Sequence, residues 1–244
     1  MKKVIKFLIT TISKFIYWAY LIKVKLTPEE LKAKKKNKLK LKLDDQLAEE
    51  TYKFFKEHFE NSVFFNSTTK IREYAIKTAV LNDKRKECTY LEFGVWKGES
   101  SNFFSKYVNK LYCFDSFEGL SEDWAGWSGV KGQFNLGKKI PTLNSNIEVT
   151  VGLVDDTLDN FLKKHNPKIN FVHMDFDTYT PTKFTLEKIK PYLIKDSIII
   201  FDELYNYLGW KNGEFKALYE VFKEDEFIYK AFNLNNEQCV IQIT

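Results

Sequence analysis

Cysteine, glycine and proline are scarce in this chain of 244 residues, and each shortage excludes a class of protein. The three cysteines, Cys88, Cys113 and Cys239, lie far apart, which excludes a disulfide scaffold and a zinc ribbon and is typical of a reducing compartment. Ten glycines and five prolines are too few for a low-complexity or fibrous protein. Apolar side chains are abundant, with 44% hydrophobic and 16% aromatic residues, which excludes disorder over most of the length.

Arginine is also scarce, and the positive charge is confined to one end of the chain. The two arginines are Arg72 and Arg85, whereas base-reading and phosphate-clamping sites favour arginine. Residues 1–42 hold 13 lysines and two acidic residues, a net charge of +11, so the rest of the chain carries −6. A mildly acidic body does not suit nucleic-acid phosphates, and we therefore predict no nucleic-acid partner.

Residues 1–43 are predicted to form a basic amphipathic segment. The run 4–24 is apolar but interrupted by three lysines, which disfavours a membrane-spanning helix, and it lacks the cleavage site of a signal peptide. Apolar residues and lysines fall on different faces of a helix, and a lysine-rich run follows at 32–42. We expect residues 1–42 to contact a membrane surface peripherally. A helix packed on the body or on a partner, and a single span, are the alternatives.

Residues 44–87 contain two stretches with apolar side chains three or four positions apart, which predicts a helical N-terminal extension. From residue 88 onward, strand-like and helical runs alternate, which predicts a parallel sheet covered on both faces. The predicted strands are 88–93, 110–114, 147–152, 169–174, 196–201, 226–232 and 237–243.

The last two predicted strands are joined by only a short loop, so we expect an antiparallel hairpin. The prediction is therefore an α/β, Rossmann-like fold, with a seven-stranded, mostly parallel sheet, N-terminal helices and a C-terminal hairpin. This is the strand pattern of class I methyltransferases, and it is not a dehydrogenase pattern.

In such sheets ligands bind at the carboxyl ends of the strands. The first predicted strand ends in Glu92, followed by Gly94 and Gly98 in a G-x-x-x-G turn that lets the backbone approach a ligand closely. The spacing matches neither the dinucleotide fingerprint nor a P-loop. Glu92 disfavours a pyrophosphate and suits a cationic ligand such as S-adenosylmethionine, and a turn without a ligand is the alternative.

Acidic residues also follow the second and third predicted strands. Asp115 suits the diol of a ribose, with a helix N-cap as the alternative. Asp155 and Asp156 follow the third strand, and one of them suits an adenine amino group while the other, or Thr157, caps the next helix. We place Asp155 at the ligand.

Four acids follow the fourth and fifth predicted strands: Asp175, Asp177, Asp202 and Glu203. Unpaired, they would repel one another at neutral pH. A divalent cation would resolve the repulsion, because hard cations prefer oxygen ligands. The alternative is that some of these acids cap helices or pair with lysine.

Five ordered motifs resemble the macrocin O-methyltransferase family, which comprises metal-dependent class I sugar O-methyltransferases of the macrolide-tailoring type. The motifs are YLEFGVWKGESS, YCFDSFEGL, GLVDDTLDNFL, FVHMDFDTYTPTK and IIIFDELYNY. The resemblance extends from about Thr69 to Ala217 and leaves the basic segment outside. It implies S-adenosylmethionine as methyl donor, Mg²⁺ as cofactor, and 88–244 as the methyltransferase domain.

The resemblance also implies site residues. The metal ligands would be Asp177, Asp202 and Glu203, although this chain has Asp-Glu where the macrolide enzymes have Asp-Asp. Asp177 is also our candidate catalytic residue, near the proton that the acceptor loses. His173 matches a position that is commonly histidine, and we expect it to pack beneath the site. With the positions that we add from the strand ends, the predicted donor-binding residues are Glu92, Gly94, Gly98, Ser100, Asp115, Ser116, Asp155, Asp156 and Asp175.

We therefore predict a Mg²⁺-dependent O-methyltransferase that acts on a sugar or glycan hydroxyl, in the cytoplasm or at the inner membrane face. The Trp-rich loop 123–134 is a candidate lid over the sugar, with an ordered surface loop as the alternative, and 205–210 is a candidate second wall. A catechol-like phenol acceptor and a non-catalytic, membrane-tethered scaffold remain the competing interpretations. The sequence leaves open whether the chain forms a homo-oligomer.

Overall fold

The computed structural model describes residues 10–18 and 38–244. The chain divides into two compact units, residues 1–49 and 50–244. In the predicted amphipathic segment, residues 10–18 are described and helical. Residues 1–9 and 19–37 of that segment lie outside the described residues. In the part of the chain that is described, no helix combines the length and the apolar character needed to cross a membrane.

The elements alternate along the chain as the sequence pattern predicts. In chain order they are α3 (Lys38–Phe59), β1 (Val63–Phe65), α4 (Thr68–Asn82), β2 (Thr89–Phe93), α5 (Glu99–Phe104), η1 (Ser105–Tyr107), β3 (Leu111–Asp115), β4 (Ile147–Val151), α6 (Val154–His165), β5 (Ile169–Met174), α7 (Tyr179–Ile189), η2 (Lys190–Tyr192), β6 (Leu193–Phe201), η3 (Trp210–Asn212), α8 (Glu214–Val221), η4 (Glu224–Glu226), β7 (Phe227–Asn233) and β8 (Cys239–Ile243).

The strands form one sheet in the order β1-β7-β8-β6-β5-β2-β3-β4. Strand β8 runs antiparallel to both of its neighbours, and all other pairs are parallel. The α/β fold and the C-terminal hairpin are thus confirmed. The sheet gains an eighth strand, β1, whose three residues are too short to show the alternation that marks a strand in a sequence.

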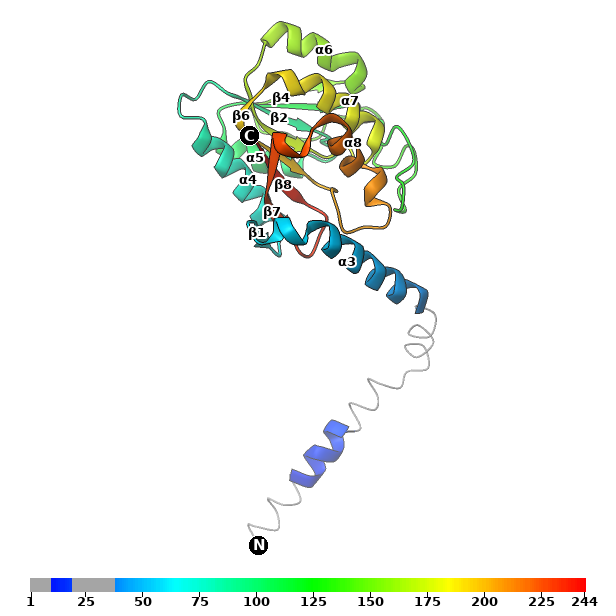
Figure 1. Cartoon of the computed structure of the whole chain (residues 1–244). Coiled ribbons are helices and arrows are strands. Elements are labelled where there is room, and N and C mark those ends of the chain that lie inside the picture. Colours follow the sequence, from blue (N-terminus) through cyan, green and yellow to red (C-terminus); the bar gives the residue numbers. More distant parts are fainter. Residues whose placement is uncertain (1–9, 19–37) are drawn as a thin grey trace. The chain divides into compact units, whose positions relative to one another are not determined.

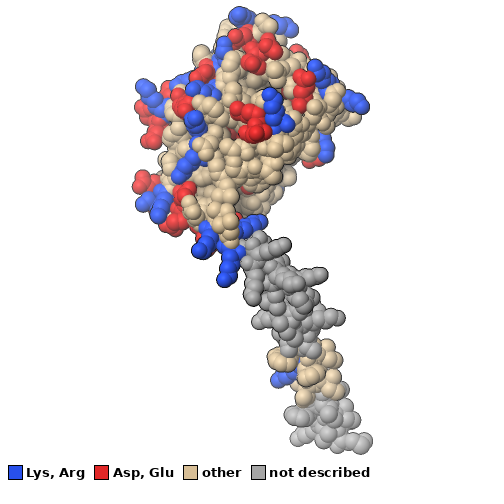
Figure 2. Space-filling view, turned by 90° about the vertical axis from the view of Figure 1, so that its right-hand side faces the viewer, with Lys and Arg blue, Asp and Glu red and all other residues tan. Residues whose placement is uncertain are grey.

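Helices cover the central strands on both faces. Helices α4 and α5 pack together on one side of the sheet, and α6, α7 and α8 form the layer on the other (Figure 1). All six residues of β5 are consequently buried, and four of them are apolar. On the face of the body shown in Figure 2, acidic and basic side chains are interspersed.

The strand register brings the predicted site residues to one edge of the sheet. Phe93 of β2 lies opposite Met174 of β5, which in turn lies opposite Phe201 of β6. The ladder continues past the strands, because the Asp175 N–H donates to the Phe93 carbonyl (2.9 Å) and the Asp202 N–H donates to the Met174 carbonyl (2.9 Å). The residues that follow each strand therefore lie side by side.

Candidate functional site

A cavity of about 580 Å³ opens at the carboxyl ends of β2 to β6, and this volume is typical of a small-molecule site. Most of the predicted site residues line it. The predicted residues in the wall are Gly94, Ser100, Asp115, Ser116, Asp155, Asp175, Asp177, Asp202 and Glu203. Glu92, Gly98 and Asp156 are not part of the wall.

Asp115 joins two of the loops that form the wall. Its Oδ2 accepts from the N–H groups of Val95 (2.7 Å) and Trp96 (2.8 Å), and its Oδ1 accepts from the N–H of Phe117 (2.6 Å). The carboxylate thus fixes the loop after β2 and does not cap a helix. Oδ1 keeps one acceptor site for a ligand hydroxyl, whereas Oδ2 already accepts two hydrogen bonds, because a carboxylate has about two acceptor sites on each oxygen.

The two glycines of the loop after β2, Gly94 and Gly98, allow different close contacts. At Gly94, with φ +91°, a Cβ would lie 1.9 Å from the carbonyl oxygen of Asp175, so only glycine lets the ends of β2 and β5 meet. At Gly98, with φ +78°, a Cβ would lie 2.4 Å from the Leu143 side chain. Gly98 therefore permits close packing at the start of α5 and does not reach the cavity.

The two aspartates that follow β4, Asp155 and Asp156, differ in whether they face the cavity. Asp155 faces the cavity, whereas Asp156 is exposed in the first turn of α6 and is not in the wall. The helix begins after Leu153, so neither aspartate is its N-cap. Both carboxylates nevertheless lie where the positive end of the helix dipole favours negative charge.

Glu92 corrects the expectation of a carboxylate that faces a cationic ligand. Its side chain is fully buried beneath the cavity, and its Oε1 lies 2.9 Å from His173 Nδ1 on the neighbouring strand. His173 Nε2 lies 3.2 Å from Asp202 Oδ1, which also accepts from Arg72 Nη2 at 2.8 Å. We call these four residues, Glu92, His173, Asp202 and Arg72, the paired network.

The paired network contains two cations and two anions. His173 has a carboxylate at each ring nitrogen, and only the doubly protonated imidazolium donates to both. Burial alone would lower its pKa, but the hydrogen bonds to Asp202 and Glu92 outweigh burial and raise the pKa of His173 to about 9. Burial likewise opposes ionisation of Asp202, yet the Arg72 and His173 charges hold the pKa of Asp202 well below its usual range.

A second set of acids, which we call the unpaired cluster, comprises Asp175, Asp177, Glu203 and Glu214. Burial raises the pKa of Asp177 to about 7, and burial together with neighbouring carboxylates raises the pKa of Glu203 and Glu214 well above the usual range. Burial and Asp202 have the same effect on the pKa of Asp175. Among the described residues, no lysine or arginine forms an ion pair with these acids.

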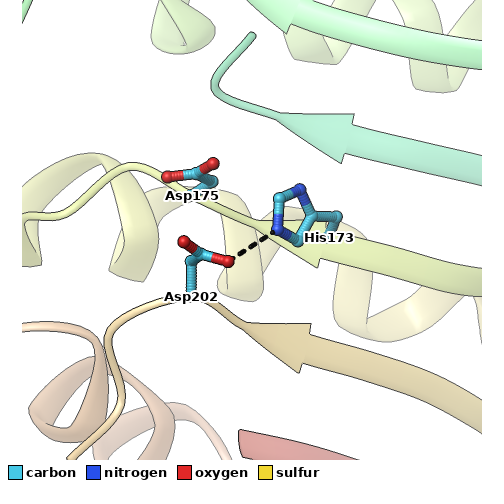
Figure 3. Close-up of side chains that lie close together, drawn as sticks. All are labelled: His173, Asp175 and Asp202. Carbon is cyan, nitrogen blue, oxygen red and sulfur yellow. Dashed lines mark hydrogen bonds and ion pairs between the residues drawn. The ribbon is translucent and has the colours of Figure 1, made fainter. Parts of the chain in front are cut away.

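Two groups in this region have the spacing of metal ligands. Asp175, Asp177 and Glu203 each offer one oxygen within 4.8 Å of the others, and a ring nitrogen of His173 has the same spacing to one oxygen each of Asp175 and Asp202. Figure 3 shows the second group, with Asp175 facing Asp202 and His173 held by Asp202. A protonated imidazole cannot bind a metal, so the carboxylates are the candidate ligands, and Asp175 belongs to both groups.

The donor set fits a hard divalent cation. The buried Oε2 of Glu203 and Oε1 of Glu214 have no hydrogen-bond partner, which is costly for ionised groups unless a cation compensates. Asp177 adopts φ +62°, a strained conformation for a non-glycine residue that is common at functional sites. Of the predicted ligands, Asp177 and Glu203 share one group with Asp175, whereas Asp202 falls in the other group, and Asp175 is the member common to both.

Sequence reasoning missed Glu214 and Gln238. Glu214 is fully buried at the start of α8, where its Oε2 accepts from the Glu203 N–H at 3.2 Å. Gln238 Nε2 donates to Asp202 Oδ1 at 2.7 Å. Neither residue follows a parallel strand directly, so the strand-end rule does not find them. Arg72, one of the chain's two arginines, forms a salt bridge with Asp202 and also lines the cavity.

Aromatic residues form the opposite wall. Trp124 and Trp127 line the cavity with their rings 5.5 Å apart and nearly stacked. A Cβ on Gly126 would lie 1.6 Å from the carbonyl oxygen of Leu208, so the Trp-rich loop is held against the neighbouring turn. The predicted second wall, residues 205–210, is instead largely core, because its two tyrosines and its tryptophan are almost fully buried.

Comparison with known proteins agrees with this fold. A sequence family described as "Methyltransferase domain" matches residues 91–204, just under half of the chain. No curated protein matches the chain in sequence. The chain therefore carries a methyltransferase domain, as predicted, and the match does not separate the macrocin-type family from other methyltransferases.

Solved structures of O-methyltransferases share the fold. CalS11, a calicheamicin methyltransferase, is 20% identical with a TM-score of 0.59, over 89% of this chain and 93% of that chain. An apo structure of CalS11, described as a TDP-rhamnose 3'-O-methyltransferase, is 22% identical with a TM-score of 0.53, over 71% and 77%. The O-methyltransferase NovP is 18% identical with a TM-score of 0.52, over 72% and 79%.

Proposed function

We propose that the chain is an S-adenosylmethionine-dependent O-methyltransferase that acts on a sugar or glycan hydroxyl with the help of Mg²⁺. The observation that carries the proposal is the unpaired cluster, which lies at the strand ends of a methyltransferase domain and faces a cavity of ligand size. Four buried acids without a cation partner are costly to stability, and groups with such perturbed pKa values concentrate at functional sites.

The donor half of the site is formed by the loops after β2, β3 and β4. Asp115, Ser116 and Asp155 line the cavity; the first two would accept from ribose hydroxyls, and Asp155 from the amino group of adenine. Gly94 leaves the backbone bare at the strand end, where a methionine moiety can approach. Glu92 acts from beneath, by holding His173, and does not contact the donor.

The acceptor half combines the acids with the aromatic wall. The cation would be held by Asp175, Asp177 and Glu203, together with Asp202, and when bound it would orient and acidify an acceptor hydroxyl. Trp127, which is about half exposed and packs against the buried Trp124, offers a flat face on which a sugar ring can stack. The likeness to CalS11, a TDP-rhamnose 3'-O-methyltransferase, supports a sugar acceptor, and the likeness to NovP supports O-methylation.

The reaction would be a direct displacement. The acceptor oxygen forms a bond to the methyl carbon while the carbon–sulfur bond breaks, and its electron pair stays on sulfur to give S-adenosylhomocysteine. The hydroxyl proton would pass to Asp177, the carboxylate that we place near the reacting oxygen. The buried, strained backbone at Asp177 holds this carboxylate in place.

Calorimetric titration of S-adenosylmethionine into the full chain, with Mg²⁺ and again with EDTA, tests the proposal. We expect donor binding in both conditions. Turnover, followed as S-adenosylhomocysteine, is expected only with Mg²⁺ and on vicinal-diol glycosides. Turnover on catechol alone would favour the phenol interpretation, and the absence of donor binding in both conditions would overturn the methyltransferase proposal.

We also propose that residues 1–42 hold the enzyme at an anionic membrane surface on the cytoplasmic side. In the described helix, Ile12, Phe15 and Ile16 share one face and are more than half exposed. The net charge of +11 over residues 1–42 would attract anionic lipid.

Sedimentation of the full chain with phosphatidylglycerol-containing vesicles tests this attachment. We expect binding that weakens with salt and falls strongly in Phe15→Glu. The matched control is Leu81→Glu, a change at a more exposed leucine of the other unit, which should bind like the wild type. Equal sedimentation of Phe15→Glu and wild type would contradict the attachment.

A further inference from the structure

The buried carboxylate of Asp202 uses its two oxygens differently. Oδ1 accepts three hydrogen bonds, from Arg72 Nη2 at 2.8 Å, from His173 Nε2 at 3.2 Å and from Gln238 Nε2 at 2.7 Å. Among the residues that the structure describes, none donates to Oδ2. One oxygen is therefore saturated by protein groups, and the other is left open beside Asp175 (Figure 3).

The three donors come from distant parts of the chain. Arg72 lies on α4, His173 on β5, and Gln238 directly before β8. Arg72 and Gln238 both lie outside the stretch that matches the methyltransferase domain family, residues 91–204. The N-terminal extension and the C-terminal hairpin thus reach into the centre of the site from opposite ends of the chain.

Two of the three donors, Gln238 and His173, are themselves held by further hydrogen bonds. Gln238 Oε1 accepts from Asn233 Nδ2 at 2.8 Å, so the amide nitrogen of Gln238 has to face Asp202. His173 Nδ1 is held by Glu92 at 2.9 Å. The guanidinium of Arg72 contacts Asp202 through Nη2, and its buried Nε has no hydrogen-bond partner, so this contact is single and not a two-pronged fork.

We infer that Arg72 and Gln238 are positioning residues, which hold Asp202 by one oxygen so that the other is directed at the cation. This inference rests on the proposed cation site. Groups that fix the ligands of a metal typically change its affinity by 10–100-fold when they are removed. A positioning role for α4 also gives a reason why the helical extension belongs to the catalytic unit.

The test is calorimetric titration of Mn²⁺, a substitute for Mg²⁺, into the metal-free full chain. We expect Arg72→Met to weaken Mn²⁺ binding 10–100-fold while S-adenosylmethionine affinity stays within threefold. Arg72→Lys should recover most of the loss, because a single N–H contact can be replaced by an ammonium. Arg85→Met is the matched control, since Arg85 is the chain's other arginine and is exposed.

The outcomes separate this inference from the cation site itself. Wild-type Mn²⁺ affinity in Arg72→Met would overturn the positioning role and leave the cation site intact. Absence of Mn²⁺ binding in the wild type would instead overturn the cation site, and the inference with it.

An unfolded Arg72→Met variant would show loss of both S-adenosylmethionine binding and a cooperative thermal unfolding transition. In that case Gln238→Glu is the test variant, because it places a carboxylate against Asp202 without removing the Arg72 cation. Weakened Mn²⁺ binding with intact donor binding in Gln238→Glu supports the inference. Wild-type Mn²⁺ affinity in that variant overturns it.

Discussion

The paired network and the unpaired cluster lie side by side at one edge of the sheet, and they differ in what compensates their charge. In the paired network, His173 and Arg72 face Glu92 and Asp202, so four fully or partly buried charges sum to zero. The four acids of the unpaired cluster, two of them buried and two partly buried, have no ion-pair partners among the described residues.

The difference separates stability from function. Buried acids are tolerated when cations and hydrogen bonds compensate them, as in the paired network. A neighbouring set without compensation costs stability in the metal-free chain, and the cost is recovered only by binding protons or a cation. In the proposed function, the paired network supports the site through Asp202, and the unpaired cluster supplies most of the cation ligands.

The largest expected effect is on catalysis. Asp177→Asn removes the proton acceptor and one ligand of the cation, so kcat/KM should fall at least about 10³-fold while donor affinity stays within about threefold. Turnover assays and calorimetry with S-adenosylmethionine measure the two quantities. Asp159→Asn, at a partly exposed ion pair with Lys188, is the control. Loss of donor affinity alongside activity would place Asp177 in the donor half instead.

Breaking the paired network should cost stability. Glu92→Gln leaves the buried imidazolium of His173 with one anionic partner, and the free energy of unfolding should fall by about 3 kcal/mol. Urea unfolding at pH 7 measures it. The control is Glu73→Gln, which removes an exposed carboxylate that pairs with two lysines and should cost far less. Equal losses in the two variants would show that the network is not ionised as described.

The pH dependence of stability should report the unpaired cluster. The pKa of Asp177 is about 7 in the folded chain and about 3.8 when unfolded, so the folded chain binds the extra proton between these values. Stability from this group is therefore present at low pH and lost as pH rises through 7, by roughly 2–3 kcal/mol between pH 5 and 8. His173, with a pKa of about 9, adds a further loss between about pH 6.5 and 9.

Urea unfolding of metal-free wild type and Asp177→Asn, at several pH values from 5 to 8, isolates the Asp177 contribution. The variant should show the smaller decline, and added Mg²⁺ should reduce the decline of the wild type. Parallel stability profiles with and without Asp177 would rule out the raised pKa.

The smallest effect is expected at Glu214. Glu214→Gln removes a buried acid while keeping an oxygen for the Glu203 N–H, so the metal-free chain should gain about 1 kcal/mol of stability. Thermal unfolding with EDTA measures the gain. A destabilised variant would mean that Glu214 is already compensated and does not belong to the unpaired cluster.

The sequence predicts the sheet and most of the site for the same physical reason. Parallel strands place their carboxyl ends at one edge, so Asp115, Asp175, Asp177 and Asp202 could be brought together from strand positions alone. The sequence does not show which of these acids forms an ion pair with a cationic side chain. Glu92 and Asp177 both sit at strand ends, and only the register opposite His173 shows that Glu92 is neutralised.

Other contacts depend on tertiary structure. Gln238 reaches Asp202 from the turn before β8, and Glu214 reaches Glu203 from the start of α8, after a long connection from β6. Asp175 was assigned to the donor from its position after β5, whereas the folded loop places it between both groups of metal-ligand spacing. These relations arise from loop paths, which local periodicity does not encode.

The most direct test of the account is calorimetric titration of Mg²⁺ into the metal-free full chain at pH 7, repeated in buffers of different ionisation enthalpy. The account predicts one cation per chain, bound with release of protons from the unpaired cluster, and an affinity that rises with pH. It also predicts that S-adenosylmethionine binds with or without the cation. Absence of Mg²⁺ binding, or binding without proton release, would contradict the claim that the unpaired cluster is a cation-binding site.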